Sequence, residues 1–202
     1  MRNPEQTRQT IIEEAAVLFN KMGYVGTSMG LLVEKIPFTK GAIYKHFANK
    51  SELASAAFDH NAKRMMDMLR VEIRRAENAP DKLRSMVDYY VNFVHKPPIE
   101  GGCPIINTSV DTMDLGNKGD HQFLREKVNG IIEIMRMSIQ KITQRGIQEG
   151  QIKADLDVEG FSALFFAAIE GGILLARVQG SEHNYRLVKR QLEIIIKSIE
   201  IG

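Results

Sequence analysis

Apolar residues recur every three to four positions along most of the chain, which is the spacing of helices that bury one face. The first such segment carries Ile11, Ile12, Ala15, Ala16 and Phe19. With Gly23 as a helix stop, this spacing predicts a helix over about residues 4–22. We find no convincing run of alternating strand residues, so the sequence predicts an all-α fold.

Two short helices are expected next, with a tight turn between them. Thr27 offers an N-cap for a helix over residues 28–35. Pro37 ends that helix, because the residue before a proline is pushed out of the helical region. Thr39 offers a second N-cap, for a helix over residues 40–46.

A larger helical body follows these short elements. Asn49, with Glu52 three residues later, is typical of a capping box and predicts the start of a long helix that reaches about residue 76. Further helices are expected at about residues 81–95, 105–114, 121–149, 158–178 and 183–200.

Composition agrees with an ordinary globular protein. Of the 202 residues, 44% are hydrophobic and 26% are charged, with no low-complexity tract. The net charge is only +2. It is unevenly distributed, because seven Lys and Arg against four Glu leave +3 on residues 1–50 and −1 on the remainder. The first quarter of the chain is therefore a mildly basic region.

The sequence also bears on location. The polar first ten residues predict no signal peptide, and the single cysteine, Cys103, cannot form a disulfide within the chain, so we expect a cytoplasmic protein. The apolar segment 161–178 is nearly long enough to span a bilayer. It contains Glu170 and Arg177, whose insertion would cost about 2.5–3.5 kcal/mol each, which favours a buried helix or a subunit interface over a membrane span.

The two short helices have the form of a helix-turn-helix that reads DNA. Lysines can neutralise phosphates, hydroxyls at helix N-termini accompany backbone N–H groups that bind phosphate, and a tyrosine can donate a hydrogen bond to the DNA backbone. Gly41 and Ala42 would allow close approach to base edges. The alternative is a solvated helix corner with no DNA partner.

One stretch resembles a known family specifically. TKGAIYKHFANKSEL at residues 39–53, together with Arg8, the apolar positions of the first helix and Gly23-Tyr24, is similar to the N-terminal signature of the TetR family of bacterial transcriptional regulators. The match covers about the first quarter of the chain, and residues 101–111, 149–157 and 167–180 agree more loosely with the family's second half.

The resemblance implies an all-helical homodimer with one helix-turn-helix per subunit. It also implies a repressor that a small-molecule effector releases from a double-stranded, palindromic DNA operator. The expected domains are a DNA-binding domain at residues 1–48 and a ligand-binding and dimerisation domain at residues 49–202.

Carried over by position, the resemblance assigns the DNA contacts. Phosphates would be held at Thr27, with Ser28 beside it, and at Thr39. The residues expected to face the major groove are Lys40, Gly41, Ala42, Lys45 and His46. Tyr44 and Lys50 would clamp the DNA backbone.

The sequence departs from the family pattern in and around the turn. Pro37 stands where a glycine is usual, and proline cannot adopt a positive φ. Val33, Ile36 and Phe38 are larger than the usual residues, which enlarges the small core, and Gly30 weakens the helix at 28–35. We therefore expect a different turn and an altered docking angle.

A regulator of this kind needs a pocket for its effector. The candidates are methionines and aromatics that fill irregular space, together with Cys103 and a carboxylate inside an apolar helix. They are Met65, Met66, Tyr89, Phe93, Cys103, Met113, Met135, Phe165, Phe166 and Glu170. The methionines could equally be ordinary core, Glu170 could make a structural pair, and Cys103 could be either a redox or electrophile sensor or a small buried residue.

The last two helices are expected to form the dimer. Their apolar residues at helical spacing are Leu164, Ala168, Leu175, Leu192, Ile195, Ile196 and Ile199, and two helices from each subunit would make a four-helix bundle.

An enzyme is the main rival class of protein. The five histidines are scattered, with no metal-binding spacing, phosphate loop or nucleophile elbow, so we expect no catalytic site, cofactor or metal. A regulator without small-molecule control is a second rival.

Overall fold

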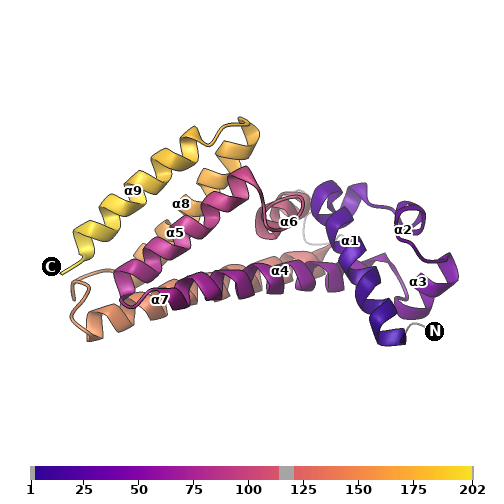
Figure 1. Ribbon diagram of the computed structural model, residues 1–202, viewed down its shortest axis with the longest axis horizontal. Helices are drawn as coiled ribbons and strands as arrows, with labels where there is room; N and C mark the ends of the chain where they lie inside the picture. The colour runs from indigo at the N-terminus through magenta and orange to yellow at the C-terminus, as the bar shows by residue number, and fades with distance from the viewer. Residues whose placement is uncertain (1–2, 114–120, 202) are drawn as a thin grey trace. The chain divides into compact units, whose positions relative to one another are not determined.

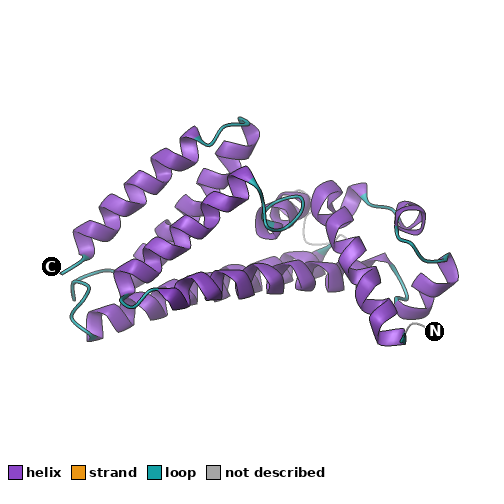
Figure 2. Cartoon of the chain, in the orientation of Figure 1, coloured by secondary structure: helices purple, strands orange, loops and turns teal. Residues whose placement is uncertain are grey.

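The computed structural model describes residues 3–113 and 121–201, which form helices joined by loops (Figures 1 and 2). The helices are α1 (Pro4–Gly26), α2 (Met29–Lys35), α3 (Lys40–His46), α4 (Lys50–Arg75), α5 (Ala79–His95), α6 (Pro104–Met113), α7 (Gln122–Gln148), α8 (Val158–Val178) and α9 (His183–Ile199). The described residues contain no strand beyond an isolated bridge between Ile152 and Glu200. The all-α prediction is confirmed.

The helix boundaries lie close to those expected from the sequence. The main difference is in α1, which continues to Gly26 across a kink at Gly23, where φ is +74°. α5 begins at Ala79, because the side chain of Asn78 accepts a hydrogen bond from the backbone N–H of Asp81 at 2.8 Å. The last residue of the helix predicted at 105–114 lies outside the described residues.

The helices divide between two compact units. Unit 1 comprises residues Met1–Met65 and Ile99–Gly130, and unit 2 comprises Met66–Pro98 and Ile131–Gly202. The division differs from the boundary predicted after residue 48, because α6 packs against α1 within unit 1 and α4 contributes residues to both units. The extent of the DNA-binding domain at residues 1–48 stays a prediction.

Unit 1 contains a small core formed by α1, α2, α3 and the start of α4. Its fully buried members include Ile11, Leu32, Ile43 and Phe47. The bulky departures from the family pattern belong to this core: Ile36 is buried in it, and Val33 and Phe38 pack against it. The larger side chains therefore fill the space between the short helices.

Unit 2 is built around α5, α8 and α9, which pack against one another (Figure 1). The hydroxyl of Tyr185 on α9 is buried and donates a hydrogen bond to the carbonyl of Val87 on α5 at 2.8 Å. Burial, together with the carboxylates of Glu170 and Asp88, raises the pKa of Tyr185 well above its ordinary value. The phenol therefore stays neutral inside the unit.

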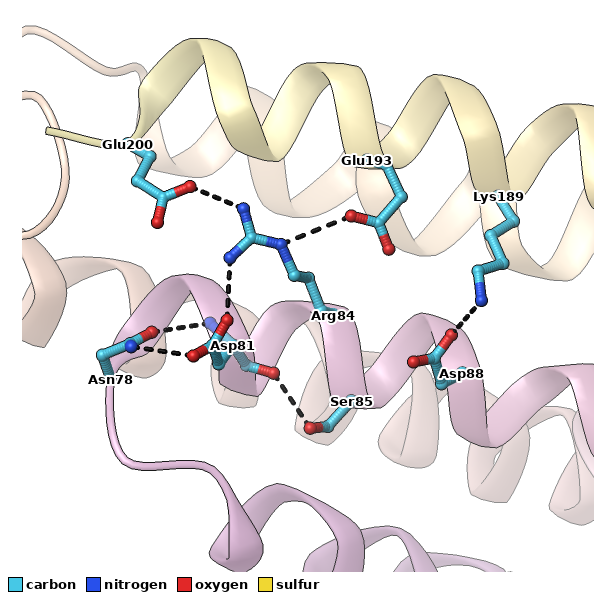
Figure 3. A network of polar contacts seen from close by, with 8 residues as sticks. All are labelled: Asn78, Asp81, Arg84, Ser85, Asp88, Lys189, Glu193 and Glu200. Carbon is cyan, nitrogen blue, oxygen red and sulfur yellow. Dashed lines mark hydrogen bonds and ion pairs between the residues drawn. The ribbon is translucent and has the colours of Figure 1, made fainter. Parts of the chain in front are cut away.

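A polar network also joins α5 to α9 (Figure 3). The guanidinium of Arg84 donates to Asp81 at 2.8 Å, to Glu193 at 3.3 Å and to Glu200 at 2.5 Å. Beside it, Lys189 pairs with Asp88. Hydrogen bonds from Arg84 and Asn78 lower the pKa of Asp81. One guanidinium thus joins carboxylates on α5, on α9 and at Glu200, the residue after α9.

Among the described helices, α8 is the one whose length and composition would allow it to cross a membrane. Eight of its residues, including Phe161, Phe165 and Ile173, are buried inside the protein, and the helix packs against α5 and α9. Its apolar character is thus partly explained by its place in the core of unit 2.

Candidate nucleic-acid interface

Helix α3 presents a polar, basic surface on the side away from its core residue. Ile43 is fully buried, whereas Lys40, Gly41, Tyr44 and Lys45 are exposed. A Cβ added at Gly41 would meet nothing within 4 Å, so the backbone there is open to close approach. Ala42 and His46 are half-buried at the edges of this surface.

The basic charge on α3 is not neutralised. Lys40 and Lys45 form no ion pair with any described residue, and no acidic residue lies between Lys35 and Glu52 in the sequence. Lys40 lies over the ring of its neighbour Tyr44, with 5.8 Å between the ammonium nitrogen and the ring centroid. The two side chains together form a cationic, hydrogen-bonding surface suited to phosphate.

The N-termini of both short helices are capped by hydroxyls. The hydroxyl of Thr39 accepts from the N–H of Ala42 at 3.2 Å, and that of Ser28 accepts from the N–H of Leu31 at 3.1 Å. Both capping residues are exposed. Each helix start thus combines a hydroxyl and backbone N–H groups where a phosphate can bind.

The structure corrects the predicted role of Thr27. Its side chain is fully buried, and its hydroxyl donates to the carbonyl of Gly23 at 2.7 Å. Thr27 was expected to be the N-cap of the second helix, but α2 begins one residue later, at Met29, and Ser28 is its N-cap. Thr27 therefore closes the end of α1, and Ser28 is the surface residue at this helix start.

The turn between α2 and α3 needs no left-handed residue. The N–H of Phe38 donates to the carbonyl of Ile36 at 2.7 Å. This bond closes a three-residue γ-turn centred on Pro37, whose ring fixes a negative φ and so suits the inverse form of the turn. Ile36 is extended, with φ −80° and ψ 131°. The turn thus differs from a glycine-type turn, as expected from the sequence.

Lys50 is held at the start of α4 against the end of α1. Its ammonium nitrogen lies 4.0 Å from the ring centroid of Tyr24, and the hydroxyl of Tyr24 lies 2.8 Å from that of Ser51. Asn49 caps α4 as predicted, because its side chain accepts from the N–H of Glu52 at 2.9 Å. The Glu52 carboxylate accepts from the N–H of Ala48 at 2.7 Å, one residue before the position that a complete capping box would use.

Arg8 has a packing role in unit 1. Its guanidinium carbon lies 4.9 Å from the ring centroid of Phe47, the C-cap residue that follows α3. The side chain therefore docks the start of α1 on the end of α3 while remaining exposed.

A polar junction between α1 and α6 was not predicted from the sequence. The Asn20 amide donates to the carbonyls of Glu100 and Gly102 at 2.7 and 2.9 Å, and the Asn107 amide donates to the carbonyls of Asn20 and Gly101 at 2.8 and 2.9 Å. Gly101 has a φ of +92°, and a Cβ there would lie 2.9 Å from the Asn20 backbone. The signal in the sequence was the Gly-Gly pair before a helix, but its partner Asn20 lies 80 residues away from Glu100 along the chain.

Comparison with known proteins identifies the family to which this fold belongs. Residues 11–57 match the model of bacterial regulatory proteins of the tetR family, and residues 79–192 match the tetracyclin repressor-like C-terminal domain. The chain belongs to the TetR family. It is therefore a DNA-binding transcriptional regulator and not an enzyme, with its helix-turn-helix in unit 1.

Individual known proteins resemble all or most of the chain. A TetR transcriptional regulator from Chloroflexus aurantiacus is 30% identical, covers 100% of both chains and superposes with a TM-score of 0.92. One from Cytophaga hutchinsonii is also 30% identical, covers 100% of this chain and 98% of its own, and superposes with a TM-score of 0.89. The transposon Tn10 TetC protein of Escherichia coli is 29% identical over 77% of this chain and 74% of its own.

The residues expected to bind an effector fall in both units. Met65, Cys103 and Met113 belong to unit 1, and Met66, Tyr89, Phe93, Met135, Phe165, Phe166 and Glu170 belong to unit 2. Most are buried, but Met113 is 70% exposed at the end of α6, because it lies on the solvent side of that helix. The structure thus removes Met113 from the predicted pocket lining.

Two polar members of this set have defined surroundings. The carboxylate of Glu170 contributes to the raised pKa of the buried phenol of Tyr185, and its role as a ligand contact or a structural group stays a prediction. The side chain of Cys103, directly before α6, is fully buried. A buried thiol is shielded from oxidants and electrophiles. The burial of Cys103 therefore disfavours its role as a redox or electrophile sensor.

The predicted dimer residues separate by burial. Leu164 and Leu175 are 58% and 48% exposed, whereas Leu192, Ile196 and Ile199 are buried inside their own subunit. Leu192, Ile196 and Ile199 recur at helical spacing, so they lie on one face of α9. This face packs against α5 and α8 and is therefore not available to a second subunit. The large exposed apolar residues of the two helices are instead Leu164, Leu174, Leu175, Val178, Leu187 and Ile194.

Proposed function

We propose that this TetR-family regulator works as a homodimeric, cytoplasmic repressor that reads a palindromic operator with α3 and leaves it when a small molecule binds. The observation that carries the proposal is the surface of α3. Its exposed residues Lys40, Gly41, Tyr44 and Lys45 include two lysines that form no ion pair with a described residue, and Ile43 anchors the helix in the core.

Each exposed group on this surface has a role. Lys40 and Lys45 neutralise phosphates, and Gly41 allows the backbone to approach base edges. The N-caps Ser28 and Thr39 bring helix N-termini to the DNA backbone, with Tyr44 and Lys50 beside them. His46 and Ala42 lie at the rim and make fewer contacts.

The exposed apolar face of α8 supports the homodimer. Leu164, Leu175 and Val178 follow one another at helical spacing along a surface that also includes the small residues Ala167 and Gly171. Small residues allow the same helix of a second subunit to approach closely, and a two-fold axis lets one patch pair with itself. Two helix-turn-helix motifs about 34–36 Å apart would then meet successive major grooves.

The test is DNA binding by lysine variants. With DNA from the region upstream of its own gene, Lys45→Ala should weaken binding about tenfold and reduce the slope of log K against log salt by about 1, because one phosphate contact is lost. Lys141→Ala, an exposed lysine on α7 in unit 2, is the matched control and should leave both values unchanged. Equal effects from the two variants would contradict the proposal.

A second measurement addresses release. Small molecules that raise the melting temperature of the protein should also displace it from the operator, because a ligand that prefers one conformation shifts the population toward it. Stabilising ligands that leave operator affinity unchanged would favour the rival in which regulation does not depend on a small molecule.

A further inference from the structure

A cavity lies inside unit 1, and none of the residues predicted to bind an effector lines it. It is bordered by α1, α4, α6 and the start of α7. Its volume is about 20 Å³. One water molecule requires roughly 10–15 Å³, so the cavity admits a small head group and not a whole drug-sized molecule.

Two polar side chains that line the cavity, Asn61 and Asp111, each leave a side-chain oxygen that accepts from no described residue. The Asn61 amide donates to the carbonyl of Ala16 at 3.0 Å, and the Asn20 amide donates to two carbonyls of the loop before α6. Among the described residues, none donates to the Asn61 side-chain oxygen or to Oδ1 of Asp111. The cavity consequently favours a ligand that brings hydrogen-bond donors.

Asp111 supplies the charge. Its Oδ2 accepts from the backbone N–H of Tyr24 at 2.5 Å and, more weakly, from that of Val25 at 3.4 Å. Its Oδ1 faces Gly23, where a Cβ would approach it to 2.8 Å. Because Gly23 has no side chain, this carboxylate oxygen stays open beside the cavity.

Aromatic rings complete the lining. Phe19 and Phe58 border the same space, and their faces attract cations. Lys50 lies over the ring of Tyr24 but does not itself line the cavity. A metal ion fits poorly, because the described residues contain no group of three or more His, Cys, Asp or Glu side chains that could hold one.

We propose that this cavity binds the ammonium head group of a small primary organic amine. The three N–H donors of the ammonium match Oδ1 of Asp111, the side-chain oxygen of Asn61 and the hydroxyl of Thr108, which also lines the space. The aromatic rings contact the charge and the first carbons of the tail. The site is distinct from the predicted effector pocket and requires no DNA.

The test is a titration of the ¹⁵N-labelled full chain with n-propylammonium chloride, at an ionic strength held constant with sodium chloride. The backbone amides of Tyr24 and Val25 report directly, because both donate to Asp111. We expect their NMR shifts to saturate with a Kd on the order of millimolar, as befits a ligand of so few atoms. n-Propanol, which has the same tail without the charge, should leave them unmoved.

Two variants make the result specific. Asp111→Asn keeps an acceptor for the Tyr24 N–H, so the fold is retained, but it removes the charge and should abolish the response. Asp59→Asn removes an exposed carboxylate of the same unit, one that pairs with Lys127 outside the cavity, and should respond like the wild type. Shifts that fail to saturate, that persist in Asp111→Asn or that appear with n-propanol would show that the cavity holds water only. Because no DNA is present, failure here is separate from failure of operator binding.

Discussion

At the scale of single residues, Gly23 at the kink of α1 should tolerate no side chain. Gly23→Ala forces a positive φ on an L-residue and brings its Cβ to 2.8 Å from Asp111. We therefore expect a loss of about 1–3 kcal/mol in the free energy of unfolding, measured by urea denaturation. Gly130→Ala is the control, since a Cβ added at that exposed α7 position meets nothing within 4 Å. It should stabilise the protein by up to about 1 kcal/mol, and equal effects would refute this account of the kink.

Tyr185 should make stability sensitive to alkaline pH. Its pKa is raised in the folded state, so below an ordinary value of 10.0 both states are protonated and its contribution is complete. Above that pH the unfolded chain loses the proton first, and folding stability falls. Tyr185→Phe loses the hydrogen bond to Val87, at a cost of about 1–2 kcal/mol at pH 8. The difference in the free energy of unfolding between wild type and Tyr185→Phe should narrow above about pH 10. A difference that stays constant in denaturation experiments would contradict the raised pKa of Tyr185.

The end of α1 also shows where local sequence stops being informative. Thr27 and Ser28 are both good N-cap residues, and the sequence assigns the cap to the first of them. The structure buries Thr27 against Gly23 and exposes Ser28. The choice depends on the kink at Gly23, whose partner Asp111 lies on the distant helix α6, so local sequence could not decide it.

At the scale of helices, the α5–α9 network gives the third stability prediction. Arg84→Gln leaves Asp81, Glu193 and Glu200 without their shared cation. We expect a loss of about 1–2 kcal/mol at pH 7 in thermal or urea unfolding. Arg145→Gln, which removes only an exposed pair with Glu149, should have little measurable effect.

The cost of Arg84→Gln should also depend on pH. The folded-state pKa of Asp81 is lowered, so its stabilising contribution is present above its ordinary value of 3.8 and is lost as pH falls through the folded pKa. The difference in the free energy of unfolding between wild type and Arg84→Gln should therefore shrink as the pH falls from 3.8 toward the lowered folded-state pKa of Asp81. A difference that does not change over this range would mean that the arginine acts through packing alone.

The spacing of apolar residues along the sequence predicts helix boundaries well, but it does not predict which helices pack against one another. The turn around Pro37 was expected to differ from a glycine turn, and it does. The contact of α6 with α1 and the links between α5 and the end of the chain were not foreseen, because they join residues 80 to 116 positions apart. Helical spacing reports which face is apolar but not which helix covers it.

At the scale of the whole molecule, the exposed face of α8 should control assembly. Leu164→Glu and Leu175→Glu place charges on the surface proposed for the dimer and should convert it to monomers, as measured by light scattering coupled to gel filtration. Val71→Glu, at a comparably exposed apolar position on α4, should remain dimeric. Monomers from the control variant, or intact dimers from both α8 variants, would place the interface elsewhere.

The family and the helical order follow from the sequence, whereas the division into units does not. The motif at residues 39–53 accounts for most of the resemblance to the family, because the spacing of its residues is required directly for DNA binding. The dimer residues were predicted by apolar period alone. That criterion could not separate the α9 face that packs inside the subunit from the face left exposed, which is why Leu192, Ile196 and Ile199 were misplaced.

The most direct test of the central claim is sequence-specific binding by the wild-type protein. Labelled DNA from the region upstream of its own gene should be bound in preference to random competitor DNA, by about 10³-fold or more, and the affinity should fall steeply as salt increases. That result would establish α3, with its Pro37 turn, as a working operator reader. Equal affinity for both DNAs, or no binding at low salt, would contradict it.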